Sequence, residues 1–274
     1  MTRRVSLLGK PLKRRHSVVM HNAAFEAAGI DARYELQELE SEQLAGFIDR
    51  ARGPDFLGLG VTAPHKKRVA ELVDEVEPDA RQIGAVNNVV RTDDGRLVGF
   101  NTDAPGFRAG VELAIGGPLA GASVVVVGAG GVAQAIVHAC REAGVGRLTV
   151  ANRSLPASPG GVEAVGLESE ELRAALASAD LAVNATTVGM VDGGMAFPVD
   201  ALPDRATVFD VVYVPAETEL LRAARARGLR AANGSEMLIA QAAIAFERWT
   251  GVGGMTEVMR QAVAPLLADP QARA

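Results

Sequence analysis

Three short segments among the first 103 residues place polar side chains in turns next to apolar stretches. They are VTAPHK at residues 61–66, GAVNN at 84–88 and GFNTD at 99–103. Ligands of open α/β sheets bind beyond the carboxyl ends of the strands. We therefore expect one cleft to gather Thr62, Lys66, Asn87, Asn101 and Asp103. A lysine beside an aspartate could move a proton there, although each charge taken alone is more typical of a surface ion pair.

A glycine-rich turn follows the run of four valines at residues 124–127. Its sequence, Gly128-Ala-Gly130-Gly131-Val-Ala133, matches the dinucleotide pattern G-x-G-x-x-[GA] between a strand and an amphipathic helix. The first glycine allows the tight turn, the second lets the backbone approach a pyrophosphate, and Ala133 lets helix and strand pack closely. The helix N-terminus would then face the phosphates. The alternative is a turn of the same fold that binds no ligand.

Asn152, Arg153 and Ser154 follow the next strand, where NAD-binding units usually carry an acid for the ribose hydroxyls. A guanidinium at this place attracts the additional phosphate of NADP and could also stack on adenine. NADP is therefore the cofactor that we expect. If Arg153 is only a solvated arginine, the choice between NADP and NAD stays open.

Composition excludes several classes of protein. Of the 274 residues, 48% are hydrophobic and 22% are charged, as in folded globular proteins. The net charge of −5 argues against a nucleic-acid partner, and the apolar runs are too short to span a membrane. A single cysteine, Cys140, with four histidines and no C-x-x-C, gives no internal disulfide and no structural zinc site. These features favour the cytoplasm.

The first 25 residues carry six basic side chains and no acidic one. A transit peptide could have this composition. The strand-like residues 5–8 and the proline at position 11 favour a folded segment instead.

Strand and helix patterns alternate along the chain, which predicts an α/β fold with mainly parallel sheets. We expect strands at residues 5–8, 32–38, 57–61, 123–127, 147–151, 181–184, 207–211 and about 230–232. The expected helices span 18–28, 41–52 with Ser41 as N-cap, 64–74 with Pro64 in the first turn, 132–143, 168–177 and 219–227. The Gly- and Pro-rich stretch 101–121 suggests a domain boundary, and the chain is expected to be helical from residue 235.

In these motifs the chain resembles the shikimate dehydrogenases, with the quinate/shikimate dehydrogenases as their sister group. The resemblance covers residues 9–251, including Gly9-Lys-Pro-Leu12 with His21-Asn22, Val61-Thr-x-Pro-x-Lys66, Asn101-Thr-Asp103, the GAGGVA turn, Asn184-Ala-Thr186, Asp210 to Tyr213, and Met237-Leu-x-x-Gln241-Ala242. It implies a substrate domain of residues 1–103 and 235–274, into which a Rossmann NADP-binding domain of residues 104–234 is inserted.

The resemblance also implies roles for individual residues. Lys66 would be the general acid/base and Asp103 its partner, with Thr62, Asn87, Asn101 and Gln241 binding substrate hydroxyls. Ser17 would bind a carboxylate and Tyr213 would lie close to the substrate, while Met237 would lie near the nicotinamide. The cofactor positions would be Gly128, Gly130, Gly131, Ala133, Asn152, Arg153 and Ser154.

The implied reaction is the reversible, NADP-dependent reduction of 3-dehydroshikimate to shikimate, a step of chorismate and aromatic amino acid biosynthesis. The substrate would be a cyclic hydroxy-carboxylate, no metal is implied, and the protein would be a monomer or homodimer. The alternatives are a quinate or amino-shikimate dehydrogenase using NAD or NADP, and a ligand-binding paralogue without activity.

Three positions depart from the family pattern. Arg15 stands where the first carboxylate-binding serine is usual, and it either grips the carboxylate or points to solvent beside Ser17. Gly60 replaces an asparagine, and we expect this to open room in the substrate site. A second basic residue after the Asn-Arg-Ser segment is missing from residues 155–159, which weakens the preference for NADP over NAD.

Overall fold

The computed structural model describes residues 2–12, 15–154 and 162–269. Contacts divide the chain into two compact units. Unit 1 consists of the residues up to Asp103 together with Ile239–Leu266, and unit 2 contains Ala104–Leu238. After Asp103 the chain builds most of unit 2 and returns to unit 1 between Leu238 and Ile239, and the described residues from Leu267 belong to unit 2 again.

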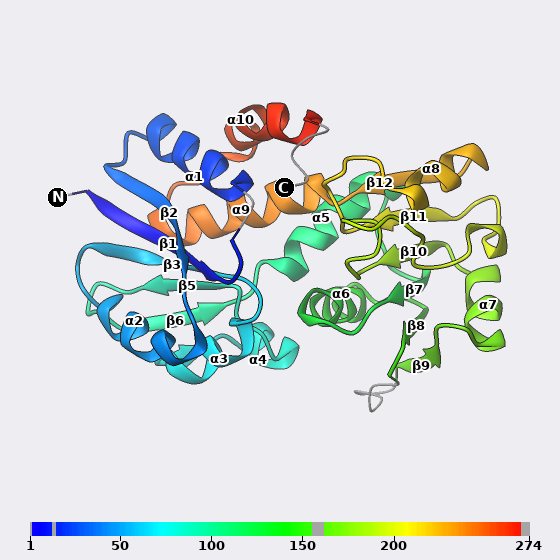
Figure 1. Ribbon diagram of the computed structural model, residues 1–274, viewed down its shortest axis with the longest axis horizontal. Helices are drawn as coiled ribbons and strands as arrows, with labels where there is room; N and C mark the ends of the chain where they lie inside the picture. Colours follow the sequence, from blue (N-terminus) through cyan, green and yellow to red (C-terminus); the bar gives the residue numbers. More distant parts are fainter. Residues whose placement is uncertain (1, 13–14, 155–161, 270–274) are drawn as a thin grey trace. The chain divides into compact units, whose positions relative to one another are not determined.

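Unit 1 is built on a six-stranded sheet in the order β2-β1-β3-β5-β6-β4 (Figure 1). Its strands are β1 (Arg3–Gly9), β2 (Ala32–Glu38), β3 (Phe56–Val61), β4 (Glu75–Val76), β5 (Asn88–Arg91) and β6 (Leu97–Phe100). The three long strands are parallel, but β5 runs antiparallel to both β3 and β6. The sheet is thus mixed, and the β5–β6 hairpin and the short β4 are absent from the sequence prediction.

Helices cover both faces of this sheet. The elements are α1 (His16–Ala27), η1 (Ser41–Gln43), α2 (Leu44–Arg50), α3 (Lys66–Leu72), α4 (Pro78–Ile83), α9 (Ser235–Thr250) and α10 (Thr256–Ala268). On one face, α2 and α3 bury Phe47, Ile48 and Val69 with Leu59 of β3. On the other face, Trp249 of α9 occupies the space over Gly58 and donates from its indole Nε1 to the Val89 carbonyl at 3.0 Å.

The predicted helices 41–52 and 64–74 begin in a different way from that expected. The helix expected from Ser41 is a 3-10 turn followed by α2, and its N-cap is Glu40, which forms a capping box with Gln43. Glu40 accepts from the Gln43 backbone and the Gln43 side chain accepts from Glu40, so Ser41 is not needed as a cap. The helix expected from Pro64 begins only at Lys66 because the preceding residues form a turn, closed by the bond from His65 N to Thr62 O.

The stretch expected to be a Gly- and Pro-rich boundary contains a full helix, α5 (Asp103–Ile115). Pro105 is tolerated because it stands in the first turn, where backbone N–H groups have no partner within the helix. Gly110 is required for close packing, since a Cβ there would lie 2.9 Å from the Met237 nitrogen.

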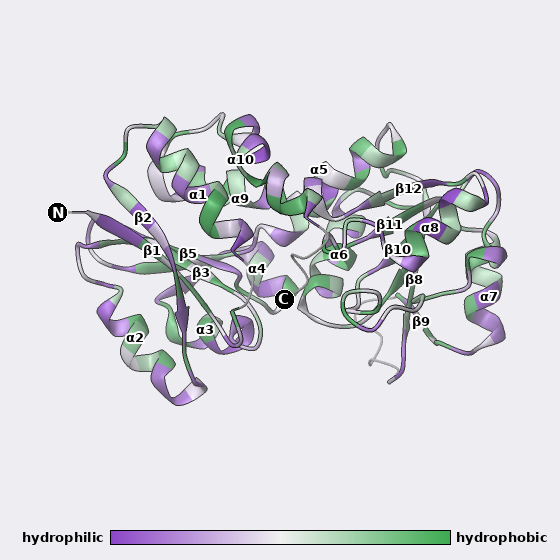
Figure 2. Ribbon diagram, turned by 45° about the horizontal axis from the view of Figure 1, so that its top comes forward, coloured by the Kyte–Doolittle hydropathy of each residue, from purple (hydrophilic) through white to green (hydrophobic). Residues whose placement is uncertain are grey.

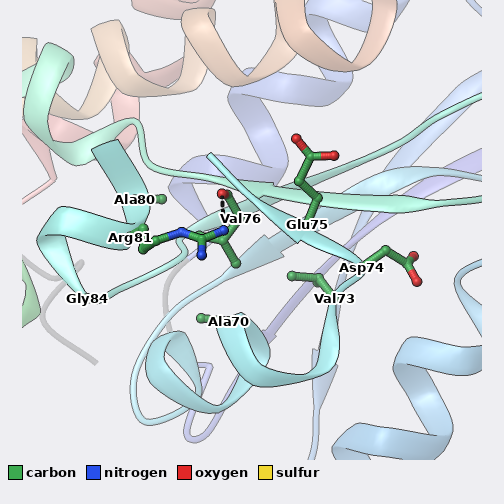
Figure 3. A pocket seen from close by; sticks show the side chains of 8 residues that line it. All are labelled: Ala70, Val73, Asp74, Glu75, Val76, Ala80, Arg81 and Gly84. Carbon is green, nitrogen blue, oxygen red and sulfur yellow. Dashed lines mark hydrogen bonds between the residues drawn. The ribbon is translucent and has the colours of Figure 1, made fainter. Parts of the chain in front are cut away.

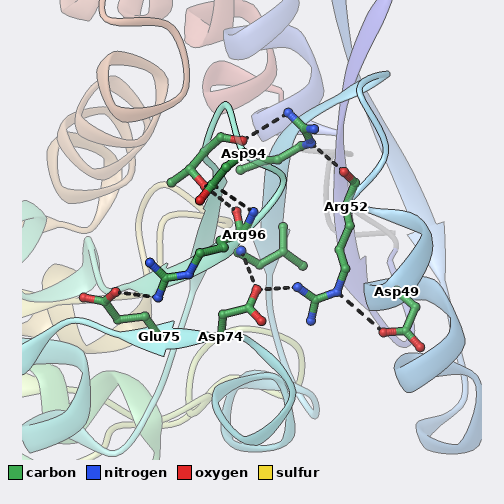
Figure 4. A network of polar contacts seen from close by, with 9 residues as sticks. Asp49, Arg52, Asp74, Glu75, Asp94 and Arg96 are labelled. Carbon is green, nitrogen blue, oxygen red and sulfur yellow. Dashed lines mark hydrogen bonds and ion pairs between the residues drawn. The ribbon is translucent and has the colours of Figure 1, made fainter.

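A polar network connects three loops of unit 1 (Figure 4). Asp74 accepts from Leu97 N at 2.7 Å and pairs with Arg52, whose carbonyl accepts from Arg91 Nε at 2.7 Å. The Leu97 N–H and the Arg52 guanidinium hold the pKa of the Asp74 carboxyl below its usual range. The network fixes the hairpin turn after β5 to the end of α2, and none of the predicted site residues belongs to it.

The sheet of unit 2 is entirely parallel, in the order β12-β11-β10-β7-β8-β9 (Figure 1). Its strands are β7 (Ser123–Val127), β8 (Arg147–Asn152), β9 (Glu163–Gly166), β10 (Leu181–Asn184), β11 (Thr207–Asp210) and β12 (Arg230–Asn233). Two strand triplets spread in opposite directions from the pair β7 and β10. This is the doubly wound order of dinucleotide-binding sheets.

The helices of unit 2 are α6 (Gly131–Glu142), α7 (Glu170–Ala177) and α8 (Glu219–Ala226), together with α5 and the 3-10 turn η2 (Val199–Ala201). Leu172 of α7 and Leu221 of α8 are buried in one core with Val125 and Val208 of the sheet. Helices such as α7 and α8 alternate between purple and green in Figure 2, as amphipathic helices do. Within the described ranges, no helix combines the length and the apolar character needed to cross a membrane.

Candidate functional site

Lys66 and Asp103 form a close ion pair in unit 1. The Lys66 Nζ lies 2.5 Å from Asp103 Oδ2, and the two side chains are 17% and 5% exposed. Lys66 is the first residue of α3, and Asp103 is the first residue of α5. A carboxylate at a helix N-terminus is stabilised by the aligned peptide dipoles, and Asp103 occupies such a position. The lysine keeps a partly accessible ammonium.

Amide side chains fix the loop that carries Asp103. Asn87 Oδ1 accepts from Thr102 N at 2.8 Å and from Asn88 Nδ2 at 2.9 Å. Asn87 Nδ2 and Asn88 Nδ2 both donate to Thr102 Oγ1, at 3.2 and 2.9 Å. Asn101 Oδ1 accepts from Asp103 N at 2.9 Å. The loop before α5 is therefore bonded to the segment that precedes β5, which fixes Asp103 opposite Lys66.

Of the five residues expected to converge, Lys66, Asp103, Asn101 and Asn87 are thus linked through contacts in the same part of unit 1. Thr62 is half-buried beyond the end of β3, where its backbone N–H donates to Leu8 O at 2.8 Å. Asn88 and Thr102 belong to the network but were not singled out from the sequence. The Asn-Asn doublet before an apolar strand was the available signal.

The other predicted substrate residues of unit 1 lie on two helices. Arg15 is exposed at the N-cap position of α1, and Ser17 is half-buried in the first turn of that helix. Gln241 is half-buried on α9. No hydrogen bond or ion pair joins any of these three to Lys66 or Asp103 in the described part of the chain.

Gly60 does not open room, contrary to expectation. A Cβ on Gly60 would lie 2.6 Å from the Tyr34 hydroxyl oxygen and 3.1 Å from Leu7 Cδ1. The place of the missing side chain is taken by a phenol that reaches across from β2. The sequence could not reveal this, because Tyr34 is far from Gly60 along the chain.

The glycine-rich turn of unit 2 has the geometry that a dinucleotide needs. Gly128 has a φ of 126°, and a Cβ there would lie 2.8 Å from the Ala185 carbonyl oxygen, so only glycine fits. Gly130, the N-cap of α6, has no atom within 4 Å of its Cβ position and no side-chain cap. Ala133 is buried against the sheet. Open space in front of free N–H groups suits a pyrophosphate.

Asn152 ends β8, and Arg153 and Ser154 follow it on the surface of unit 2. Asn152 Nδ2 donates to Ser154 O at 2.9 Å, which shapes this turn. Arg153 has no ion pair with any residue in the described ranges, so its guanidinium is available to a phosphate. Residues 155–159, in which the sequence has no second basic residue, lie outside the described residues.

A second buried network lies at the carboxyl ends of β10 and β11. Asp210 Oδ1 accepts from Asn184 Nδ2 at 2.9 Å and from Val212 N at 3.0 Å, and its Oδ2 accepts from Thr218 Oγ1 at 2.7 Å. Burial raises the pKa of the Asp210 carboxyl, and these three donors oppose the rise. The network holds the loop of residues 211–218, in which Tyr213 is half-buried. Met237 is buried on α9, where it packs against Gly110.

A pocket of about 320 Å³ in unit 1 lies elsewhere (Figure 3). Its lining comes from α3, β4 and α4 and includes Ala70, Glu75 and Arg81. The Arg81 guanidinium donates to the Val76 carbonyl at 3.2 Å. None of the predicted site residues lines it.

The doubly wound sheet of unit 2, with its glycine turn open in front of α6, defines a dinucleotide-binding α/β protein. Family models agree along the chain. Residues 7–89 match the shikimate dehydrogenase substrate binding domain, residues 112–190 match shikimate/quinate 5-dehydrogenase, and residues 234–264 match the shikimate 5'-dehydrogenase C-terminal domain.

Known proteins agree over almost the whole chain. The shikimate dehydrogenase (NADP(+)) of Symbiobacterium thermophilum is 42% identical, over 96% of this chain and 94% of the relative. The crystal structure of shikimate 5-dehydrogenase from Thermus thermophilus in complex with NADP(H) and shikimate has a TM-score of 0.87 at 37% identity and covers 96% of this chain and 99% of that one. Quinate dehydrogenase from Corynebacterium glutamicum in complex with NAD has a TM-score of 0.86 at 35% identity, with coverages of 96% and 99%. The chain belongs to the shikimate dehydrogenase family.

Proposed function

We propose that the protein is an NADP-dependent shikimate dehydrogenase that interconverts 3-dehydroshikimate and shikimate. The observation that carries the proposal is the Lys66–Asp103 pair, held by an amide network in a chain that belongs to this family. The 42% identical relative is named shikimate dehydrogenase (NADP(+)). In this proposal, unit 1 with its returning helices binds the substrate and unit 2 binds the dinucleotide.

The chemistry divides between cofactor and protein. The nicotinamide, when bound, exchanges a hydride with the carbinol or ketone carbon of the substrate. In the direction of reduction, the Lys66 ammonium donates a proton to the substrate oxygen on which negative charge develops. Asp103 orients the ammonium and a neighbouring substrate hydroxyl. Thr62, Asn87, Asn101, Gln241 and Tyr213 would bind the remaining hydroxyls, and Ser17 would bind the carboxylate.

The cofactor residues fit NADP on this structure's own geometry. The open space at Gly130 leaves the first N–H groups of α6 free for the pyrophosphate, while Gly128, Gly131 and Ala133 shape the turn. Arg153, which has no ion pair among the described residues, would bind the additional phosphate of NADP between Asn152 and Ser154. Met237 would lie near the nicotinamide. We further propose that the protein works in the cytoplasm as a monomer or homodimer.

A matrix of initial rates tests the proposal. Shikimate and quinate, each with NADP and with NAD, should give the highest kcat/KM for shikimate with NADP. Quinate with NAD is the second candidate, since the relative from C. glutamicum is a quinate dehydrogenase in complex with NAD and Arg15 departs from the family pattern. A protein that binds these acids but oxidises none of them would be the paralogue without activity.

A further inference from the structure

The side chain of Tyr34 is buried, but its hydroxyl has no hydrogen-bond partner in the described part of the chain. The residue is 3% exposed. Burial raises the pKa of this phenol, so the group keeps its proton and remains a donor. Buried tyrosine hydroxyls usually have a hydrogen-bond partner. The Tyr34 oxygen is not among the fully buried unpaired side-chain atoms of the described residues, so it keeps some access from outside and a ligand can supply the missing acceptor.

The position of this hydroxyl is fixed by α1. Asn22 of that helix brackets the Tyr34 backbone: its Nδ2 donates to Tyr34 O at 3.1 Å, and its Oδ1 accepts from Tyr34 N at 2.8 Å. The His21 ring stacks on the phenol with a centroid distance of 4.4 Å and an angle of 24°. Because this packing already fixes the Tyr34 side chain, little rotational freedom is left to lose when its hydroxyl binds a ligand.

The hydroxyl ends against β3, beside Gly60. Successive strand residues alternate between faces, so Gly60 and Thr62 point to the same face and lie roughly 6.6 Å apart along the chain. Trp249 occupies the preceding position of this face, over Gly58, and only Thr62 beyond Gly60 is half-buried. The phenol hydroxyl thus lies next to the accessible end of β3, where Thr62 supplies a second hydroxyl.

The third group comes from the start of α1. Ser17 precedes His21 by four residues, so the two lie on one face of the helix, and His21 stacks on Tyr34. The first turn of α1 has no acidic residue and no side-chain cap, which leaves its N–H groups and its positive dipole end available. Three hydroxyls and a helix N-terminus, with no carboxylate among them, suit an anion.

We propose that Tyr34 determines substrate specificity: its hydroxyl, beside the hydroxyl-binding Thr62, donates a hydrogen bond to the carboxylate of the cyclic substrate together with Ser17. The inference rests on the proposed function and deepens it. It names Tyr34 as the residue whose hydroxyl occupies the space that a side chain at position 60 would take. Arg15, exposed one residue before α1, adds positive charge at the same helix end.

Tyr34→Phe tests the proposal, because it removes the hydroxyl and keeps the ring. We expect KM for shikimate to rise about tenfold while kcat and KM for NADP stay within about twofold, as for a lost binding interaction. Leu7→Val is the matched control: Leu7 is the other neighbour of the Gly60 position, carries no polar group, and should leave KM unchanged. The melting temperature of each variant verifies folding.

A second variant restores a hydroxyl from the opposite strand. With Phe at position 34, the nearest ring atom would be the one now 3.5 Å from a Cβ on Gly60, which is ordinary contact, so Tyr34→Phe with Gly60→Ser can place a serine hydroxyl there. We expect the double variant to recover at least half of the lost affinity. Gly60→Ser alone should impair binding, since its Cβ would collide with the Tyr34 oxygen.

Calorimetric binding of shikimate and of its methyl ester separates the possible failures. A wild-type protein that binds shikimate without turnover contradicts the proposed function but leaves this inference standing. Equal affinity of wild type and Tyr34→Phe for shikimate overturns the inference, and so does an equal loss for acid and ester, because the hydroxyl would then not bind the carboxylate.

Discussion

The two units differ in how their buried polar networks end. In unit 2, Asp210 is fully buried and its bonds to Asn184, Val212 and Thr218 all lie inside the protein. In unit 1, the amides of Asn87 and Asn88 bind Thr102. The next residue, Asp103, pairs with Lys66, whose side chain remains 17% exposed. A closed network stabilises loops, whereas an open one holds a charge where a substrate can reach it. Burial of a charge alone therefore does not identify a catalytic group.

The strongest test of this contrast is Lys66→Ala. Loss of a general acid/base should lower kcat by about 10²-fold or more, with a smaller effect on KM. Steady-state kinetics with shikimate and NADP measures the change. Lys67→Ala, one residue further along α3 and exposed, is the control. A Lys66 variant that keeps most of its kcat would remove the lysine from the mechanism and with it the distinction between the networks.

Asp210→Ala should act on stability instead. It leaves the Asn184, Val212 and Thr218 donors without their acceptor, and we expect the free energy of unfolding to fall by roughly 2–4 kcal/mol. Urea denaturation measures this loss. Asp204→Ala, whose carboxylate is 98% exposed, should change stability by less than about 0.5 kcal/mol. Unaltered stability of the Asp210 variant would mean that the closed network does not hold its loops.

Arg153→Ala addresses the exposed charge of unit 2. Removing a charge-assisted bond to the additional phosphate should weaken NADP binding by roughly 1.5–3 kcal/mol and leave NAD nearly unchanged. Calorimetry with both dinucleotides measures the difference. Equal losses would assign Arg153 to adenine stacking or to the shape of the turn. Arg173→Ala removes the same charge from helix α7 and serves as the control.

The effect of His21 is the smallest at neutral pH. Burial lowers the pKa of His21 to about 3 from the usual 6.5, so below pH 6.5 the folded state binds fewer protons than the unfolded state. The free energy of unfolding is therefore unaffected by the titration of His21 above pH 6.5, and it decreases as the pH falls from 6.5 toward 3. The raised pKa of Asp210 has the opposite sign, because it favours the folded state as the pH falls.

His21→Phe should flatten the acid side of the stability profile, measured by thermal melts between pH 4 and pH 7. Phenylalanine suits the aromatic cluster of Tyr34, Phe246 and Trp249, and it removes only a ring whose Nδ1 has no partner in the described structure. A profile as steep as that of the wild type would assign the acid sensitivity to carboxylates.

Sequence patterns predicted unit 2 better than unit 1 for a physical reason. The valine run of β7 and the glycine turn are local signals, and the expected strands at 123–127 and 181–184 have the bounds of β7 and β10. The β5–β6 hairpin has four-residue strands whose pairing depends on non-local neighbours, so alternation alone favoured a parallel arrangement. The loop at 84–88 was recognised by composition, but its amide bonds to Thr102 were not.

The candidate site followed the same rule. The sequence motifs marked Lys66 and Asp103, and the structure brings them into contact, but their catalytic roles stay predictions. The replacement of a side chain at Gly60 by Tyr34 could not be foreseen, because it depends on a phenol that crosses from a different strand. Gly60 was interpreted as added space, although the place was already filled.

The return of α9 into unit 1 has a consequence for biosynthesis. Trp249 covers Gly58 and bonds to Val89, and Arg248 pairs with Glu77, so the first sheet is completed by residues that are made only after the strands of unit 2. The strands of unit 2 and its helices α5 to α8 lie in one uninterrupted stretch of chain and can fold once β12 has left the ribosome. Until α9 has been made, the face of β3 that contains Gly58 and Gly60 stays uncovered on the nascent chain. The N-terminal half of this protein therefore depends on protection from aggregation for longer than the half synthesised after it.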